Sequence, residues 1–232
     1  MNEAANITTF LDSIPGDVEV IVVDSSTDDT PTIVERHRGR RTTVIRAKAN
    51  IAVARQIGSE AATTPWLLFT DADVVFAPGY FDRVAWRRLR PDCGGIVGVK
   101  SSVEGFDRYH RWFIRGQAAL MAFGVPAATG SNMLVRADAL ASVGGFDRQL
   151  SVNEDTEVMF RIKRAGWYIE FGPDLVVHSF DHRRLEAGLA RKVLHGAVRN
   201  TALYLGCFGA HVRRSDWGYW SDCRIESPST LR

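Results

Sequence analysis

Cysteine is scarce in this chain, and its spacing argues against two kinds of stabilised protein. The 232 residues contain three cysteines, Cys93, Cys207 and Cys223. An odd number of cysteines without Cys-x-x-Cys spacing predicts neither a disulfide framework nor a zinc site. We therefore expect a reducing compartment, the cytoplasm.

An excess of one charge and long apolar runs are also missing. The 29 Lys and Arg residues nearly balance 27 Asp and Glu residues, and the net charge of +2 is too small to indicate a nucleic-acid partner. No apolar run approaches the ~20 residues of a membrane helix, and no signal-peptide pattern stands at the amino terminus. With 45% hydrophobic and 24% charged residues, one globular domain with a sizeable core is expected.

Strand and helix patterns alternate along the chain, which favours an α/β fold built from parallel βα units. Apolar runs predict strands at residues 18–23, 42–46, 66–70, 94–100 and 175–177. Helices are predicted at residues 2–13, 31–38, 50–62, 106–123 and 156–165, with another from Pro78 to about residue 90.

Two aspartates, Asp71 and Asp73, end the run at residues 66–70 and precede a predicted loop at residues 74–78. The carboxyl end of a strand is where open α/β sheets bind ligands. Two close carboxylates repel each other unless a cation lies between them, and oxygen ligands suit Mg²⁺ or Mn²⁺. The motif predicts a metal-chelated diphosphate as the ligand. A turn in which aspartate caps the next helix is the alternative.

Similar acidic motifs follow other predicted elements. Asp24 ends the strand at residues 18–23 and opens a Ser, Thr and Asp segment, which would also cap the next helix. A Gly-Gly-Phe-Asp motif begins at Gly144, and a Glu-Asp pair, Glu154 and Asp155, opens a helix. In this order and spacing, Val-Val-Asp-Ser-Ser-Thr-Asp, Asp-Ala-Asp, Gly-Gly-Phe-Asp and Glu-Asp resemble the motifs of family 2 inverting glycosyltransferases.

The resemblance covers residues 2–180 and implies a GT-A fold, with a Rossmann-like, mostly parallel sheet flanked by helices. We expect a GT-A domain at residues 1–180 and a helical carboxyl-terminal extension at residues 181–232, packed on the same domain. The family's first strand and its Pro-x-x-Asn-Glu turn would precede Asn2 and Glu3, so we expect either that the start of the chain is misassigned or that the protein lacks this strand. Glu3, as the tail of this turn, is expected at the edge of the donor site.

The resemblance also assigns roles to individual residues. It implies that Asp73 binds the metal ion and that Asp71 lies nearer the ribose or reaches the metal through water. His178, at a predicted strand end, is the candidate third metal ligand, and a structural histidine is the alternative. Asp155 would be the base that takes the proton of the acceptor hydroxyl. Acidic residues in the first turn of a helix also have a purely structural explanation.

The donor nucleotide would contact two further residues. Asp24 would accept a hydrogen bond from the nucleobase, and Arg55 would hold the pyrophosphate. Asp24 is followed by two serines, whereas the family pattern runs Asp-Asp-Gly-Ser. A lone helical arginine is otherwise a solvated charge. Residues 129–133 are expected to form a strand on the acceptor side, where Gly130 would allow a sugar to approach closely.

Residues 185–205 have the periodicity of an amphipathic helix, with a basic stripe of Arg184, Arg191, His195 and Arg199. This stripe is either a solvated face or a contact with the donor pyrophosphate or an anionic lipid-linked acceptor, at the inner face of the cell membrane. The chain lacks the Gln-x-x-Arg-Trp motif and the membrane helices of processive synthases, so a single addition to a saccharide or lipid-linked acceptor is expected. A nucleotidyltransferase and a non-catalytic nucleotide-sugar-binding domain are the alternatives.

Overall fold

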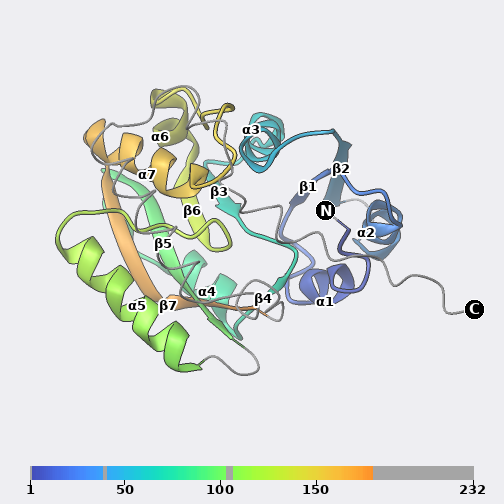
Figure 1. The fold of residues 1–232 in the computed structure, drawn as a ribbon, viewed down its shortest axis with the longest axis horizontal. Helices are drawn as coiled ribbons and strands as arrows, with labels where there is room; N and C mark the ends of the chain where they lie inside the picture. Colours follow the sequence, from blue (N-terminus) through green and yellow to red (C-terminus); the bar gives the residue numbers. More distant parts are fainter. Residues whose placement is uncertain (1, 39–40, 103–106, 180–232) are drawn as a thin grey trace, which may run out of the picture.

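The chain has a mixed α/β fold (Figure 1), described by a computed structural model over residues 2–38, 41–102 and 107–179. In chain order its elements are α1 (Ile7–Asp12), β1 (Val20–Asp24), α2 (Thr30–Arg38), β2 (Thr42–Arg46), α3 (Ile51–Ala61), β3 (Trp66–Phe69), β4 (Val74–Phe76), α4 (Tyr80–Ala85), β5 (Cys93–Ser102), α5 (Asp107–Ala122), β6 (Met133–Arg136), α6 (Ala137–Ser142), α7 (Glu154–Arg164) and β7 (Tyr168–Ser179). The predicted α/β class is confirmed.

The prediction of a mostly parallel sheet is wrong. Strands β1 and β2 form a parallel pair, and a second sheet has the order β3-β6-β5-β7-β4. In that sheet only β5 and β7 run parallel, whereas β6 is antiparallel to β3 and β5, and β4 is antiparallel to β7. An alternation of strands and helices does not fix strand direction, because the loop after a helix can return the chain to the end of the sheet where the earlier strand finished.

Several predicted boundaries also shift. Residues 74–76, predicted as a loop, form β4, because Val75 pairs with His178 on the long strand β7. Residues 129–132, predicted as part of a strand, form a turn before β6. Helix α1 begins at Ile7, because residues 2–4 instead hydrogen-bond with residues 26–30.

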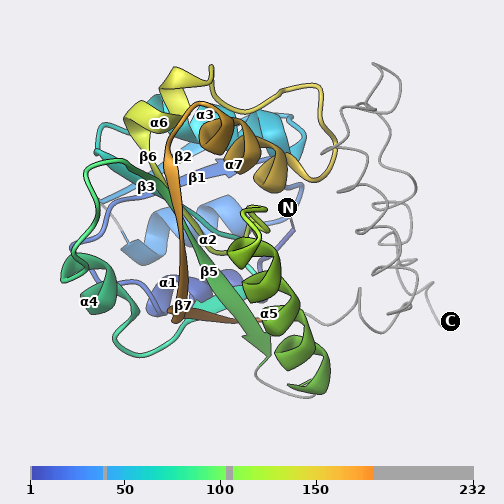
Figure 2. The same ribbon diagram turned by 90° about the vertical axis from the view of Figure 1, so that its left-hand side faces the viewer.

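Two apolar clusters pack the helices against the strands. The first joins α1, α2, β4 and α4, and in it the ring of Phe76 lies next to the rings of Phe10 and Tyr80. The second joins β3, β6, α6 and α7, and in it the rings of Phe69 and Phe146 meet edge to face at 5.0 Å. Helix α5 lies along β5 (Figure 2). Packing of the helices on the two sheets therefore positions the ends of β1, β3 and β5.

The β1–β2 pair lies to the right of β3 in Figure 1. Within residues 2–179 as described, β1 has the single strand partner β2, and β3 has the single partner β6. The expected helix at residues 185–205, with Arg184, Arg191, His195 and Arg199, lies outside the described residues. None of the described helices is long and apolar enough to cross a membrane.

Candidate active site

The candidate active site is centred on Arg55, a residue of α3. Asn50 caps the amino terminus of this helix, because its side chain accepts a hydrogen bond from the backbone N–H of Val53 at 2.8 Å. Three other segments meet the Arg55 guanidinium: the loop after β3, the turn before β6 and the start of α7. The fold therefore brings together residues that are 99 positions apart in the sequence.

Arg55 forms ion pairs with two carboxylates. Its Nη2 atom lies 3.2 Å from Oδ1 of Asp71, and its Nη1 atom donates to Oε1 of Glu154. The Arg55 side chain is only 8% exposed. Burial alone would lower the pKa of Arg55, but the charges of Glu154, Asp71 and Asp155 raise it. Arg55 is thus a permanent buried cation among carboxylates, and the alternative of a solvated charge is wrong.

Asp155 is oriented by two backbone N–H groups. Its Oδ2 atom accepts a hydrogen bond from Gly130 at 2.7 Å, and its Oδ1 atom accepts one from Thr156 at 2.6 Å. Burial raises the pKa of Asp155, although Arg55 and these two hydrogen bonds oppose that change. A carboxylate with a raised pKa is a stronger base than a solvated one, as proton transfer requires.

Glu154 lies beside Asp155 and is more deeply buried. Burial raises the pKa of Glu154 to about 7; the charge of Arg55 opposes this increase, and the charges of Asp155 and Asp71 add to it. Glu154 faces Arg55, whereas Asp155 faces the turn at Gly130. The two neighbouring carboxylates therefore have different surroundings.

The loop after β3 is connected to the same turn. Ser131 donates a hydrogen bond from Oγ to Oδ2 of Asp71 at 2.6 Å. Lys100, near the end of β5, donates from Nζ to Oγ of Ser131 at 3.2 Å and lies 3.8 Å from Oδ2 of Asp73. Asp71 and Asp73 therefore each face a cation.

The side chains of the described residues do not complete a divalent-metal site by themselves, so a bound ion would need further ligands from the substrate or water. The described residues contain no group of three or more His, Cys, Asp or Glu side chains placed to hold a metal. His178 lies within β7, opposite Val75 and Ser101, and does not join Asp71 and Asp73 in such a group. Two adjacent carboxylates fit a Mg²⁺ or Mn²⁺ ion whose other ligands are phosphate oxygens and water.

The local charges agree with this fit. Four carboxylates, Asp71, Asp73, Glu154 and Asp155, lie around two cations, Arg55 and Lys100. One negative charge remains when Glu154 is protonated, and two remain when all four carboxylates are ionised. A divalent cation would offset this excess in either state.

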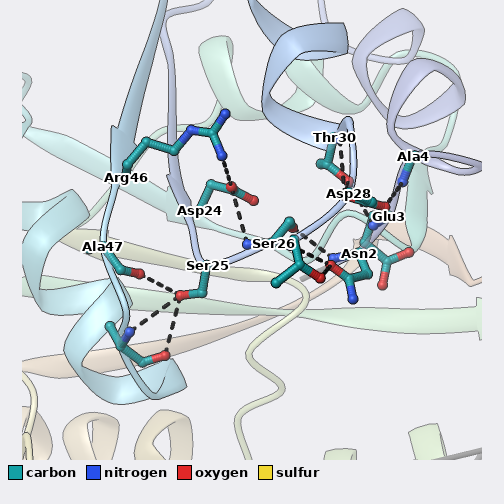
Figure 3. Close-up of polar contacts among 12 residues, drawn as sticks. Asn2, Glu3, Ala4, Asp24, Ser25, Ser26, Asp28, Thr30, Arg46 and Ala47 are labelled. Atoms are coloured by element: carbon teal, nitrogen blue, oxygen red, sulfur yellow. Dashed lines mark hydrogen bonds and ion pairs between the residues drawn. The ribbon is translucent and has the colours of Figure 1, made fainter.

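A second polar cluster follows β1 (Figure 3). Asp24 has a side chain that is 4% exposed, and its Oδ2 atom lies 3.4 Å from Nη1 of Arg46 and accepts the backbone N–H of Ser26 at 3.2 Å. Asn2 donates from its backbone N–H to Oγ of Ser26 at 2.7 Å. The loop after β1 is thus closed by the residues that precede α1.

Glu3 belongs to this cluster. Its backbone N–H donates to Oγ1 of Thr30 at 2.9 Å, and its carboxylate accepts a hydrogen bond from Asn6 at 2.8 Å. Asp28 caps α2 through the backbone N–H of Thr30 at 3.0 Å, so the capping explanation of this segment is correct for Asp28. Helix α3 packs on β1 and carries Arg55, and it therefore connects the two clusters.

The Gly-Gly-Phe motif has an anchoring role in the structure. Gly144 and Gly145 both have positive φ angles, +76° and +77°, which glycine adopts without strain. The backbone N–H of Phe146 donates to Oε1 of Gln56, one residue after Arg55, at 2.7 Å. Arg161 of α7 donates to the carbonyl of Gly145 at 2.7 Å. The motif ties α3 to α7, and so ties Arg55 to Asp155.

Sequence reasoning brought Asp71, Asp73, Arg55 and Asp155 into one site, but it missed Lys100 and the role of Ser131. Lys100 ends a predicted strand, and a single lysine there carries no recognisable signal. Ser131 lies in the predicted 129–133 segment, but as part of a strand rather than the turn that bonds to Asp71.

The sequence is similar to curated bacterial proteins. It is 26% identical over 190 residues to the succinoglycan biosynthesis protein ExoA of Rhizobium meliloti, covering 73% of this chain and 57% of that protein. It is 28% identical over 209 residues to a pre-mycofactocin glycosyltransferase of Mycobacterium tuberculosis, covering 84% of this chain and 44% of that protein. The chain therefore spans about half the length of these curated relatives.

Solved structures share the fold. The mannosyltransferase PcManGT from Pyrobaculum calidifontis, in complex with GDP-Man and Mn²⁺, aligns with a TM-score of 0.67 and 22% identity over 96% of this chain and 69% of that one. Glucosyl-3-phosphoglycerate synthase from Mycobacterium tuberculosis aligns with a TM-score of 0.60 and 19% identity over 86% of this chain and 76% of that one. These similarities show that the fold is GT-A.

The family model described as glycosyltransferase like family 2 matches residues 7–193, which is most of the chain and contains both polar clusters except for their residues before Ile7. The chain belongs to glycosyltransferase-like family 2.

Proposed function

We propose that this protein transfers a sugar from a nucleotide-diphosphate donor to an acceptor hydroxyl, with inversion at the anomeric carbon. The observation that carries the proposal is the placement of Asp155. Asp155, in the first turn of α7, has a raised pKa and accepts a hydrogen bond from the Gly130 N–H. It belongs to the same network of polar side chains as Asp71.

In this proposal Asp155 takes the proton of the acceptor hydroxyl as its oxygen attacks the anomeric carbon. Negative charge then builds on the departing diphosphate, where Lys100 and a metal ion held by Asp73 and Asp71 would stabilise it. A bound Mg²⁺ or Mn²⁺ ion would supply Lewis-acid stabilisation of the leaving phosphate. Because one base acts from the face opposite the leaving group, the configuration inverts.

The donor is a nucleotide sugar in this proposal, and two solved structures of the same fold support it. One contains GDP-Man and Mn²⁺, and another, TarS of S. aureus, contains UDP-GlcNAc. Asp24 would accept a hydrogen bond from the nucleobase after exchanging its contact with Arg46, and Glu3 would lie at the edge of the same site. The transfer is a single addition to a saccharide or lipid-linked hydroxyl.

The test is a donor panel. The purified protein is incubated with UDP-, GDP- and dTDP-sugars, Mn²⁺ and candidate acceptors, and release of the nucleoside diphosphate is followed. Proton NMR of the product reports the anomeric configuration. We expect one donor class to be consumed and the product to have the inverted configuration. A product that keeps the donor configuration would overturn the inverting mechanism. Formation of a nucleoside triphosphate and a sugar 1-phosphate from the nucleotide sugar, when pyrophosphate replaces the acceptor, would indicate a nucleotidyltransferase.

A further inference from the structure

We infer that Arg55 is a positioning residue that holds the base Asp155 in place relative to the metal-binding carboxylate Asp71, rather than a ligand of the donor pyrophosphate. This inference rests on the proposed function. It replaces the role that the family resemblance implied for Arg55 with one that follows from its contacts.

The contacts of Arg55 leave little room for a donor phosphate. Each terminal nitrogen already faces a carboxylate, Nη2 at 3.2 Å from Asp71 and Nη1 at Glu154, and the side chain is 8% exposed. A pyrophosphate would have either to reach the remaining N–H groups of a side chain that is 8% exposed or to displace one of these carboxylates. Breaking a buried ion pair in this way is costly, because it leaves a buried charge without its partner.

The ion pairs of Arg55 connect two segments whose relative position matters for the proposed reaction. Asp71 belongs to the loop after β3, and Glu154 is the first residue of α7, directly before Asp155. A planar guanidinium has a fixed fork geometry, so it sets the separation of the groups that it joins. Arg55 therefore fixes the start of α7, and with it Asp155, relative to the Asp71 loop.

Gly130 connects this fork to Asp155 directly. A Cβ atom at Gly130 would lie 2.2 Å from Nη2 and 2.4 Å from Nη1 of Arg55, so only glycine leaves space for the guanidinium. The backbone N–H of the same residue donates to Oδ2 of Asp155 at 2.7 Å. The position of the guanidinium and the orientation of the base are thus coupled through one residue. The absence of a side chain at Gly130 therefore leaves the space that the Arg55 guanidinium occupies.

Two substitutions disturb this arrangement from different elements. Arg55→Lys keeps the positive charge but loses the fork. Gly130→Ala keeps Arg55 and the N–H that binds Asp155, but it forces the guanidinium to move. Gly116→Ala is the matched control, because among the described residues nothing lies within 4 Å of a Cβ atom built at Gly116, which is on α5. Thermal unfolding and circular dichroism would verify that each variant folds.

For a positioning residue, turnover should fall while donor binding is retained. A displacement of about 1 Å in a catalytic group costs on the order of 10²-fold in rate. We therefore expect kcat to fall at least 10-fold in Arg55→Lys and in Gly130→Ala, and nucleotide affinity, measured by calorimetry with Mn²⁺, to change less than about 3-fold. Gly116→Ala should match the wild type in both. A loss of affinity of 10-fold or more in Arg55→Lys with kcat unchanged would overturn the inference in favour of a pyrophosphate ligand.

A second readout needs neither donor nor metal. In ¹⁵N-labelled protein, the amide proton of Gly130 reports its hydrogen bond to Asp155. We expect this resonance to move in Arg55→Lys and to stay in place in Gly116→Ala. An unchanged Gly130 resonance would contradict the positioning role even if the wild-type protein transferred no sugar, so this result is independent of the proposed function. An inactive wild-type protein whose Gly130 resonance moves in Arg55→Lys would refute the proposed function and keep the structural coupling.

Discussion

Replacing Glu154 by glutamine tests whether the folded protein binds a proton at this buried carboxylate more tightly than the unfolded chain does. Burial raises the pKa of Glu154 from an ordinary value of 4.5 to about 7. The folded protein therefore binds a proton at Glu154 more tightly than the unfolded chain does. Glu154 favours the folded state most strongly below pH 4.5, and this contribution is lost as the pH rises toward 7.

The size of the effect follows from the two pKa values. At about 1.4 kcal/mol per pH unit, a separation between 4.5 and about 7 corresponds to about 3 kcal/mol. This figure is an upper bound, because Asp155 also has a raised pKa and competes for the same proton. Glutamine has the shape of the protonated side chain and does not titrate.

The assay is urea unfolding of wild type and Glu154→Gln at pH 5 and at pH 8, without metal or nucleotide. We expect the variant to gain stability relative to wild type on going from pH 5 to pH 8, by about 1 to 3 kcal/mol. Glu60→Gln, which changes an exposed glutamate whose pKa is lowered, is the control and should not show this gain. If Glu154→Gln lost stability relative to wild type between pH 5 and pH 8, Arg55 would be holding Glu154 ionised, and the assignment of its charge would be wrong.

Three further substitutions probe other parts of the account. Asp73→Ala should weaken binding of UDP or GDP in the presence of Mn²⁺ at least 10-fold by calorimetry, and EDTA should do the same to the wild type; unchanged affinity in both tests would remove Asp73 as a metal ligand. Asn132→Ala should destabilise the fold by about 2 kcal/mol or more in thermal unfolding, because the Tyr80 hydroxyl and two buried carbonyls lose their hydrogen-bond partner. A loss of stability under about 0.5 kcal/mol would refute this. Asn50→Ala should cost about 1 kcal/mol through loss of the α3 cap, and no change would indicate that tertiary packing alone fixes the helix start.

Local patterns predicted much of the fold. The strand at residues 42–46 matches β2, and Asp24 and Asp71 do stand at strand ends. Apolar runs and capping residues are read from neighbouring positions, so such features are visible in a single sequence. Strand direction and the edge strand β4 are not, because they depend on which distant strand supplies the partner.

The same distinction applies to the site. Asp71, Asp73 and Asp155 were predicted from short acidic motifs, but the contacts that give them different surroundings come from other elements. The ion pairs of Arg55 with Asp71 and Glu154 could not be predicted, because these partners lie 16 and 99 residues away in the sequence. Lys100 carries no motif at all, although it lies 3.8 Å from Asp73. Side-chain networks between distant segments determine the chemistry of these groups.

The most direct measurement of the central claim is the turnover of Asp155→Asn with the preferred donor from the panel. Asparagine keeps the shape and an oxygen that can accept the Gly130 N–H, but it cannot take a proton. We predict that kcat falls on the order of 10²-fold or more while nucleotide affinity changes little. Near-normal turnover in Asp155→Asn would contradict the account and would make Glu154 the candidate base.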